Sequence, residues 1–248
     1  MLNTLLQKVK SFFLPQPENG CPDADTAKEV RETIARNNKK IPPSALLDDL
    51  RFVVMDLETT GFEYGNGDEI IAVGAVTVRN GQIRREEYFH QFVYPYRLVP
   101  GKVVNLTGIG REMLVGCPSF LGILPRFLDF IGSSVIVGHC VDFDLGFINS
   151  KIKKCCQAKI KNRALDTAVL ARALYPAEED YSLDSLLALY AIEPAGRHSA
   201  LGDALLTAQL FVNLLARLKE QKVYTLEDLD QFLKQHLQLG QQESVFIR

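Results

Sequence analysis

The spacing of apolar residues changes at about residue 50, and this change divides the chain. In segment 1–14 the apolar residues recur at helical spacing, and segment 24–40 is also typical of a helix. The Pro-, Asn- and Gly-containing run between them is expected to be a linker, and Pro42 and Pro43 end this part of the chain. We therefore predict an N-terminal helical extension and linker at 1–49. Its first helix either packs on the domain or binds a partner or a membrane surface.

Short apolar runs after Arg51 are typical of buried β-strands. FVVMDL and IIAVGAVTV predict two strands, and the alternating residues 86–94 predict a third. The Asn80-Gly81 dipeptide predicts a hairpin before the third strand. VIVG predicts a fourth strand, and a short fifth is expected near Ala164–Leu165.

Helical patterns alternate with the later strands, which indicates an α/β fold. Helices are expected at 110–131 with an interruption at Pro118, from Asp144 onward, up to Pro176, at 182–191 with Ser182 as its cap, and at about 199–219. Thr225 and Asp228 predict the cap of a last helix. Three hairpin-linked strands followed by alternating helices and strands predict a mixed sheet, three antiparallel strands and then parallel ones, flanked by helices. We place this domain at 50–220 and a C-terminal helix and tail at 221–248.

Composition agrees with a well-filled core and excludes few partners. The chain has 248 residues, 47% of them hydrophobic, and a net charge of -2, so bulk charge does not indicate a nucleic-acid partner. Five cysteines without a C-x2-C pair argue against a zinc ribbon or a disulfide framework and favour a reducing cytoplasm. We found no apolar run of membrane-spanning length and no secretory signal, so a cytoplasmic protein without a membrane partner is expected.

Four carboxylates and a histidine stand at the ends of these apolar elements. Asp56 and Glu58 lie two residues apart on one strand, so their side chains share a face. Asp144 follows another buried strand, and His198 and Asp203 flank the start of a helix. Each acid alone has an ordinary explanation at a strand end or helix start, but together they would repel one another unless divalent cations lay between them. The pattern predicts a two-metal phosphodiesterase.

Three segments around these residues resemble the motifs of the DEDDh exonuclease superfamily. They are DLETTG at 56–61, HCVDFD at 139–144 and HSALGDA at 198–204, and the connecting LTGIGREML and LDTAVLAR are also similar. The similarity covers roughly residues 50–217 and is greatest to the branch of epsilon proofreading subunits of bacterial DNA polymerase III. It implies a ribonuclease-H-like fold and a 3'→5' exonuclease that releases nucleoside 5'-monophosphates.

The resemblance also implies a role for each residue. Two divalent cations, Mg²⁺ or Mn²⁺, are the implied cofactors, and His198 is the implied general base. The implied metal ligands are Asp56, Glu58 and Asp203 for the first ion, and Asp56 with Asp144, largely through water, for the second; the implied substrate-binding residues are Glu58, Thr59, Thr60 and Phe143. Spacing alone does not choose the base, because His139 and His198 each precede an aspartate by five positions.

One residue departs from the family's pattern. The superfamily commonly has Asn where this chain has Cys140, and cysteine is a poor hydrogen-bonding partner. We therefore expect the loop before Asp144 to be supported in a different way here.

The expected substrate is single-stranded DNA or a frayed DNA 3' end, in proofreading or repair, with a DNA polymerase subunit as a further partner. RNA is an alternative substrate, because ribonuclease T and oligoribonuclease share the five residues. A catalytically quiet polymerase-binding subunit is the alternative outside the enzymes. The basic segment 149–163 is either a phosphate-contacting patch or a solvated helix face. The tail Gln242–Phe246 resembles peptides that bind the bacterial sliding clamp.

Overall fold

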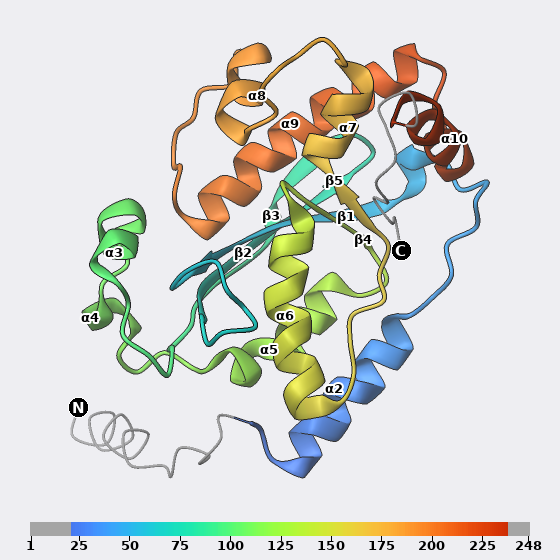
Figure 1. Ribbon diagram of the computed structural model, residues 1–248. Coiled ribbons are helices and arrows are strands. Elements are labelled where there is room, and N and C mark those ends of the chain that lie inside the picture. The colour runs from blue at the N-terminus through green and yellow to red at the C-terminus, as the bar shows by residue number, and fades with distance from the viewer. Residues whose placement is uncertain (1–20, 238–248) are drawn as a thin grey trace.

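A computed structural model describes residues 21–237 of the chain (Figure 1). The expected helix at 1–14 and the clamp-like tail Gln242–Phe246 lie outside the described residues. A mixed five-stranded sheet forms the centre of the molecule, in the order β3-β2-β1-β4-β5. The strands are β1 (Arg51–Thr59), β2 (Ile70–Arg79), β3 (Gln82–Phe92), β4 (Val135–Gly138) and β5 (Ala164–Asp166).

The strand directions confirm the predicted topology. β1 pairs antiparallel with β2, and β2 with β3, whereas β4 runs parallel to both β1 and β5. Asn80 and Gly81 both have positive φ, 53° and 65°, and form the two-residue hairpin between Arg79 and Gln82. The predicted start of β3 at residue 86 was wrong. The strand begins at Gln82, on the sheet edge, where most of the early residues are exposed and leave no apolar alternation to detect.

Helices cover both faces of the sheet (Figure 1). α7, α8, α9 and α10 pack on one face in one apolar cluster, and α2, α5 and α6 pack on the other. The helices are α2 (Ala24–Asn37), α3 (Gly101–Thr107), α4 (Arg111–Leu114), α5 (Phe120–Ile131), α6 (Val141–Cys156), α7 (Thr167–Leu174), α8 (Leu183–Leu189), α9 (Ala200–Glu220) and α10 (Leu226–Leu237), with a 3-10 turn, η1, at Leu47–Asp49.

The helices differ from the prediction in three places. The interrupted helix expected at 110–131 is two separate helices, α4 and α5, and Ser119 caps α5 by accepting a hydrogen bond from the backbone N–H of Gly122. α3 was not predicted, because its seven residues are too few to show a helical period and none of them is buried. α6 begins at Val141 rather than at Asp144, so Asp144 lies within its first turn.

The predicted caps of α8 and α10 are confirmed. The Ser182 hydroxyl accepts a hydrogen bond from the N–H of Ser185. Thr225 and Asp228 bond reciprocally, each side chain accepting from the other's backbone N–H at 3.1 and 2.9 Å. At the start of both helices, a side chain thus accepts a hydrogen bond from a backbone N–H that has no partner within the helix.

α9 is the core helix of the fold. Among the described helices it alone has the length and mean hydropathy to cross a membrane, and core helices of soluble proteins pass the same test. It lies against β1 and β2 and buries Phe211, Leu214 and Leu218 in the core. Its apolar character is therefore explained by packing within the protein.

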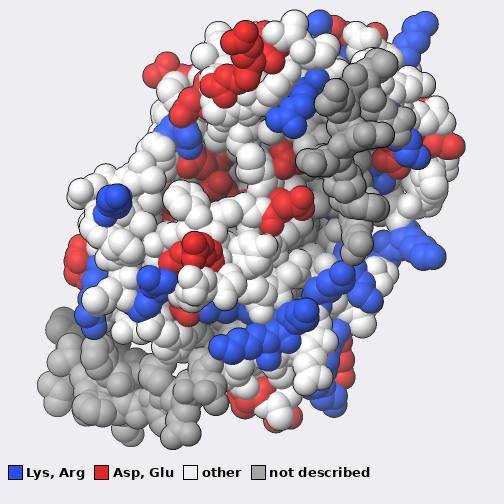
Figure 2. Space-filling model, in the orientation of Figure 1, with Lys and Arg blue, Asp and Glu red and all other residues white. Residues whose placement is uncertain are grey.

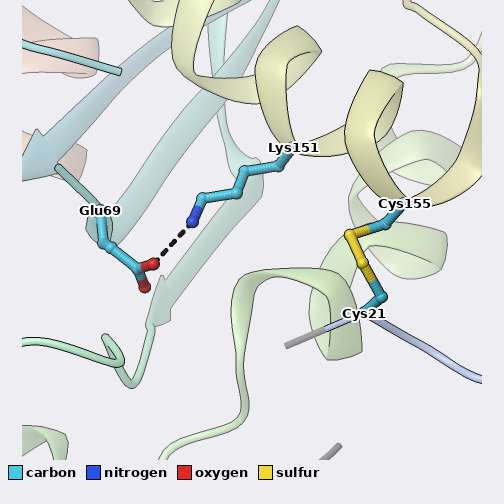
Figure 3. Close-up of a disulfide and its surroundings, with 4 residues drawn as sticks. All are labelled: Cys21, Glu69, Lys151 and Cys155. Carbon is cyan, nitrogen blue, oxygen red and sulfur yellow. Dashed lines mark hydrogen bonds and ion pairs between the residues drawn. A yellow bond between two sulfur atoms is a disulfide. The ribbon is translucent and has the colours of Figure 1, made fainter. Parts of the chain in front are cut away.

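A disulfide joins the start of the described chain to α6 (Figure 3). The cysteine spacing argued against a disulfide framework, but Cys21 and Cys155 are bonded across a sequence separation of 134 residues. Cys117, Cys140 and Cys156 are free thiols. The pairing arises because α2 packs on α5 and α6, a contact that spacing along the chain does not reveal.

Replacing Cys155 with Ser should lower the midpoint of thermal unfolding. The bond closes a long loop, and the chain-entropy argument sets an upper limit of about 5 kcal/mol on its stabilisation. Melts of Cys155→Ser, the wild type and the free-thiol control Cys117→Ser, each with and without dithiothreitol, measure the effect. A wild type whose melting point is the same in both conditions and equal to that of Cys155→Ser would contradict it.

Candidate active site

Three carboxylates from two elements meet at the end of β1. Asp56 and Glu58 project from the same face of β1, and Asp203 reaches them from the first turn of α9. One oxygen of each carboxylate lies within 4.8 Å of an oxygen of both others. A bulge in the β1–β2 pairing follows Glu58 and ends the regular strand there. The strand end and the helix start therefore place the predicted acids in one cluster.

A glycine allows α9 to approach the sheet closely enough to form this cluster. Gly74 of β2 lies directly opposite Asp56 in the antiparallel pair. A Cβ atom at Gly74 would lie 2.1 Å from the backbone carbon of Ala200, the first residue of α9. The backbone of α9 therefore rests on the backbone of β2, and this contact sets the distance from Asp203 to Asp56.

The segment before α9 holds the Asp203 carboxylate by both oxygens. The backbone N–H of His198 donates to Oδ2 at 2.9 Å, and Arg197 donates from Nη1 to Oδ1. His198 has a positive φ of 61°, which turns its N–H back toward the helix. A Cβ at Gly202 would overlap the carbonyl oxygen of Gly196, so the segment can fold back only because residue 202 is glycine.

Asp144 reaches the same strand from the opposite layer. It is 3% exposed, and its Oδ1 accepts the backbone N–H of Leu57 at 3.1 Å. Leu57 lies between Asp56 and Glu58, so the fourth carboxylate also lies at the end of β1. It does not belong to the group of three carboxylates whose oxygens lie within 4.8 Å of one another.

The electrostatics of the cluster favour a bound cation. Burial raises the pKa of Asp56 well above its ordinary value, and the charges of Asp144 and Asp203 raise it further. Burial, and then the charge of Asp203, raise the pKa of Glu58 to about 7. Carboxylate oxygens are the ligands that Mg²⁺ and Mn²⁺ prefer, and a divalent cation would relieve this repulsion. The donor set therefore fits the implied metal ions.

The two candidate histidines have different surroundings. The Nδ1 of His139 lies 2.9 Å from the hydroxyl of Thr167 on α7, and burial lowers the pKa of its ring. His198 is bonded through its backbone to Asp203, a member of the carboxylate cluster. The structure thus ties His198 to the cluster and engages His139 with α7.

A carboxylate supports the loop that contains Cys140. Cys140 has a positive φ of 58° and makes no capping side-chain hydrogen bond at the start of α6. Asp166 instead accepts the N–H of Val141 at 2.9 Å and that of Ala168 at 2.8 Å. One side chain thus caps α6 and α7 together and supports the loop that contains Cys140.

The expected substrate-binding residues lie at the end of β1, in the turn that follows it and in the first turn of α6. The buried Thr60 hydroxyl donates to Asp68 and accepts the N–H of Glu69, both at 3.0 Å, and Thr59 donates to the carbonyl of Gly61. These two threonines therefore shape the turn through their side chains. Phe143 contacts the ring of Phe62 at 6.0 Å between centroids.

Two residues beside the cluster were not singled out from the sequence. Phe62 is 84% exposed in the turn that follows DLETTG, and the aromatic residues Phe62 and Tyr64 in a turn rich in Gly and acidic residues were a signal for it. Arg197 precedes His198, but nothing in its spacing showed that it would pair with Asp203. Both add chemistry to the site, an exposed aromatic face and a cation.

A family model for exonucleases, RNase_T, matches residues 53–211 of the chain. The chain belongs to this exonuclease family. The matched segment contains all five residues expected to act in the site, so the family assignment and the carboxylate cluster concern the same part of the molecule.

Curated relatives of this exonuclease are DNA polymerase III proteins. This chain is 42% identical over 170 residues to DNA polymerase III subunit epsilon of Aquifex aeolicus. The alignment covers 68% of this chain and 83% of that protein. This chain is 37% identical over 182 residues to the DNA polymerase III PolC-type of Caldanaerobacter subterraneus, covering 73% of this chain. The chain spans only 13% of that larger protein.

Solved exonuclease structures share its fold. Exonuclease X in complex with 5' overhanging duplex DNA aligns with a TM-score of 0.56 and 24% identity, covering 74% of this chain and 99% of that one. The nuclease domain of 3'hExo, a DEDDh family member bound to rAMP, aligns with a TM-score of 0.61 and 18% identity, covering 69% and 94%. The predicted ribonuclease-H-like fold and the predicted class, a 3'→5' exonuclease, are confirmed.

Without metal, the unfolding free energy should fall as the pH rises from 5 to 8 because of Glu58. Its pKa in the folded protein, about 7, exceeds the ordinary 4.5, so the folded state binds the proton more tightly. The folded state is thus disfavoured as the carboxyl ionises, by up to about 3 kcal/mol. Urea unfolding in a chelator should show Glu58→Gln gaining stability over the wild type across this range. Parallel pH profiles for the two proteins would contradict the assignment.

Proposed function

We propose that this exonuclease hydrolyses single-stranded or frayed DNA from the 3' end, releasing nucleoside 5'-monophosphates in proofreading or repair. The observation that carries the proposal is the convergence of Asp56, Glu58 and Asp203 within 4.8 Å of one another at the end of β1. In a chain of the exonuclease family, such a cluster is best explained as a metal-binding catalytic centre.

Each carboxylate has a distinct place in the proposed mechanism. Asp56, Glu58 and Asp203 would hold one divalent cation, and Asp56 and Asp144 would hold a second. When bound, two cations provide Lewis acidity for the attacking water and neutralise the charge that develops on the leaving 3'-oxygen. Asp144 keeps its orientation through the N–H of Leu57, and Asp203 through that of His198.

His198 is the proposed general base. An imidazole suits this role because its ordinary pKa is close to neutral pH. At that pH it can accept the proton of the attacking water. The hydrogen bond from its backbone to Asp203 fixes the position of the residue relative to the carboxylates. A base and a metal ligand are thus held together by one contact.

An aromatic surface beside the cluster suits the bases of a single strand. The exposed Phe62 lies against Phe143, which in turn contacts Phe147 at 5.1 Å between ring centroids. Stacking on such a surface tolerates any base and needs an unpaired strand. Phe143 with Glu58, Thr59 and Thr60 then forms the proposed site of the terminal nucleotide.

A band of basic residues along α6 suits the phosphates further from the end. Figure 2 shows Lys and Arg side chains over the lower part of α6 and the segment that follows it. Lys151 pairs with Glu69 and Arg163 with Asp230, so these two are neutralised by acids. The exposed basic residues that remain in segment 149–163 are Lys153, Lys154, Lys159 and Lys161.

The relatives favour DNA over RNA and a polymerase as partner. The Aquifex aeolicus relative is a subunit of DNA polymerase III, and we propose that this chain likewise acts on DNA beside a polymerase. The tail Gln242–Phe246, outside the described residues, would supply a contact to the sliding clamp.

Digestion of matched DNA and RNA oligonucleotides tests the substrate. With a 5' label and Mg²⁺ or Mn²⁺, the protein should shorten single-stranded DNA stepwise from the 3' end and release 5'-monophosphates. Asp56→Ala, prepared in parallel, should lose this activity and so exclude a contaminating nuclease. Faster loss of RNA than of DNA would assign an exoribonuclease instead, and no cleavage of either polymer would leave a quiet binding subunit.

His198→Ala should reduce turnover about 10²- to 10⁴-fold, the usual contribution of a general base. His139→Ala should have a much smaller effect, because its ring bonds Thr167. Single-turnover rates of the two variants on one DNA oligonucleotide measure the difference. The opposite ranking would assign the base to His139.

A further inference from the structure

Arg197 connects the carboxylate cluster to α8. Its Nη1 donates to the Oδ1 of Asp203, and its Nε donates at 2.6 Å to the Oδ1 of Asp184. A second bond runs from Nη2 to the other oxygen of Asp184 at 3.3 Å. One guanidinium thus bridges a buried acid of the cluster and an acid on the surface.

The positive charge of Arg197 acts on the whole cluster. It lowers the pKa of Asp56 and of Glu58, whereas the charge of Asp203 raises both. The side chain of Arg197 is 21% exposed and that of Asp203 6%, so water screens their interaction only weakly. Arg197 therefore supplies part of the charge compensation that a bound cation would otherwise supply.

We propose that Arg197 is a positioning residue that neutralises Asp203 before metal binds and keeps only its bonds to Asp184 when a divalent cation displaces it from the Asp203 carboxylate. The inference rests on the proposed metal site. A cation at that oxygen and a guanidinium donating to it would be two positive groups in contact, which is unfavourable in a buried site.

Asp184 remains a partner for Arg197 after a cation has displaced Arg197 from Asp203. Asp184 already accepts two of its N–H groups and is 65% exposed, so its carboxylate can follow the guanidinium without losing its own solvation. A guanidinium presents donors in a fixed fork that matches a carboxylate. Loss of the Asp203 contact therefore leaves Arg197 paired rather than isolated.

The two partners of Arg197 should affect metal binding in opposite directions. Arg197→Gln removes the group that competes for Asp203, so Mn²⁺ should bind about tenfold more tightly or better, the size of one charged hydrogen bond. Its metal-free melting point should fall, because the carboxylates then repel without a counter-charge. Asp184→Asn leaves Asp203 as the one negatively charged partner of Arg197, so Arg197 should hold Asp203 more tightly and Mn²⁺ should bind more weakly.

Calorimetric titration of Mn²⁺ into chelator-treated full-length protein measures these affinities, and thermal melts with and without Mn²⁺ report the folding of each variant. Arg163→Gln is the matched control, because Arg163 makes a similar two-bond ion pair with Asp230 away from the cluster. It should lower the melting point with and without Mn²⁺ equally and leave the affinity unchanged.

Weaker or unchanged Mn²⁺ binding by Arg197→Gln would overturn the proposal, since Arg197 would then only help to build the site. Tighter binding by Asp184→Asn would overturn it as well. If the wild type took up no Mn²⁺, the proposed metal site and this inference would both fail. Saturable binding by the wild type with the wrong order among the variants would reject the inference alone.

Discussion

The structure depends on holding several mutually repelling carboxylates at one end of a central strand. Burial and neighbouring charges raise the pKa of Asp56 and of Glu58, the latter to about 7. The folded protein therefore disfavours the charged form of both carboxyl groups. Rigid elements impose this arrangement. Asp56 and Glu58 are fixed by the β1 backbone, and Asp203 by the close approach of α9 to Gly74. The repulsion between these carboxylates is the reason why we propose that the site binds divalent cations.

The sheet topology explains why residues so distant in sequence meet. β1 is the middle strand, antiparallel to β2 and parallel to β4. Because β4 runs parallel to β1, the helix that follows it starts beside the end of β1 and presents Asp144 to Leu57. α9 crosses the opposite face and presents Asp203. Helices on two faces thus contribute acids to one strand end, as the proposed two-ion chemistry requires.

Periodicity and motifs predicted most of this arrangement, and long-range pairing accounts for what they missed. The alternation and apolar runs around Asp56 and Asp144 identified the strands, and motif spacing identified the acids. Spacing could not predict that Arg197 pairs with Asp184, or that Asp166 caps the start of α6, because such contacts depend on how separate elements pack. The Cys21–Cys155 bond escaped prediction for the same reason. α3 escaped because a helix of seven residues is too short to show a hydrophobic period.

Anomalous diffraction from crystals soaked in Mn²⁺ is the most direct test of the central claim. Two peaks about 3.5–4 Å apart should lie at the end of β1, with Asp56 between them and Glu58 and Asp203 around one of them. The claim would be contradicted if the anomalous peaks lay elsewhere on the surface. It would also be contradicted if the carboxylates of Asp56, Glu58 and Asp203 faced no common peak.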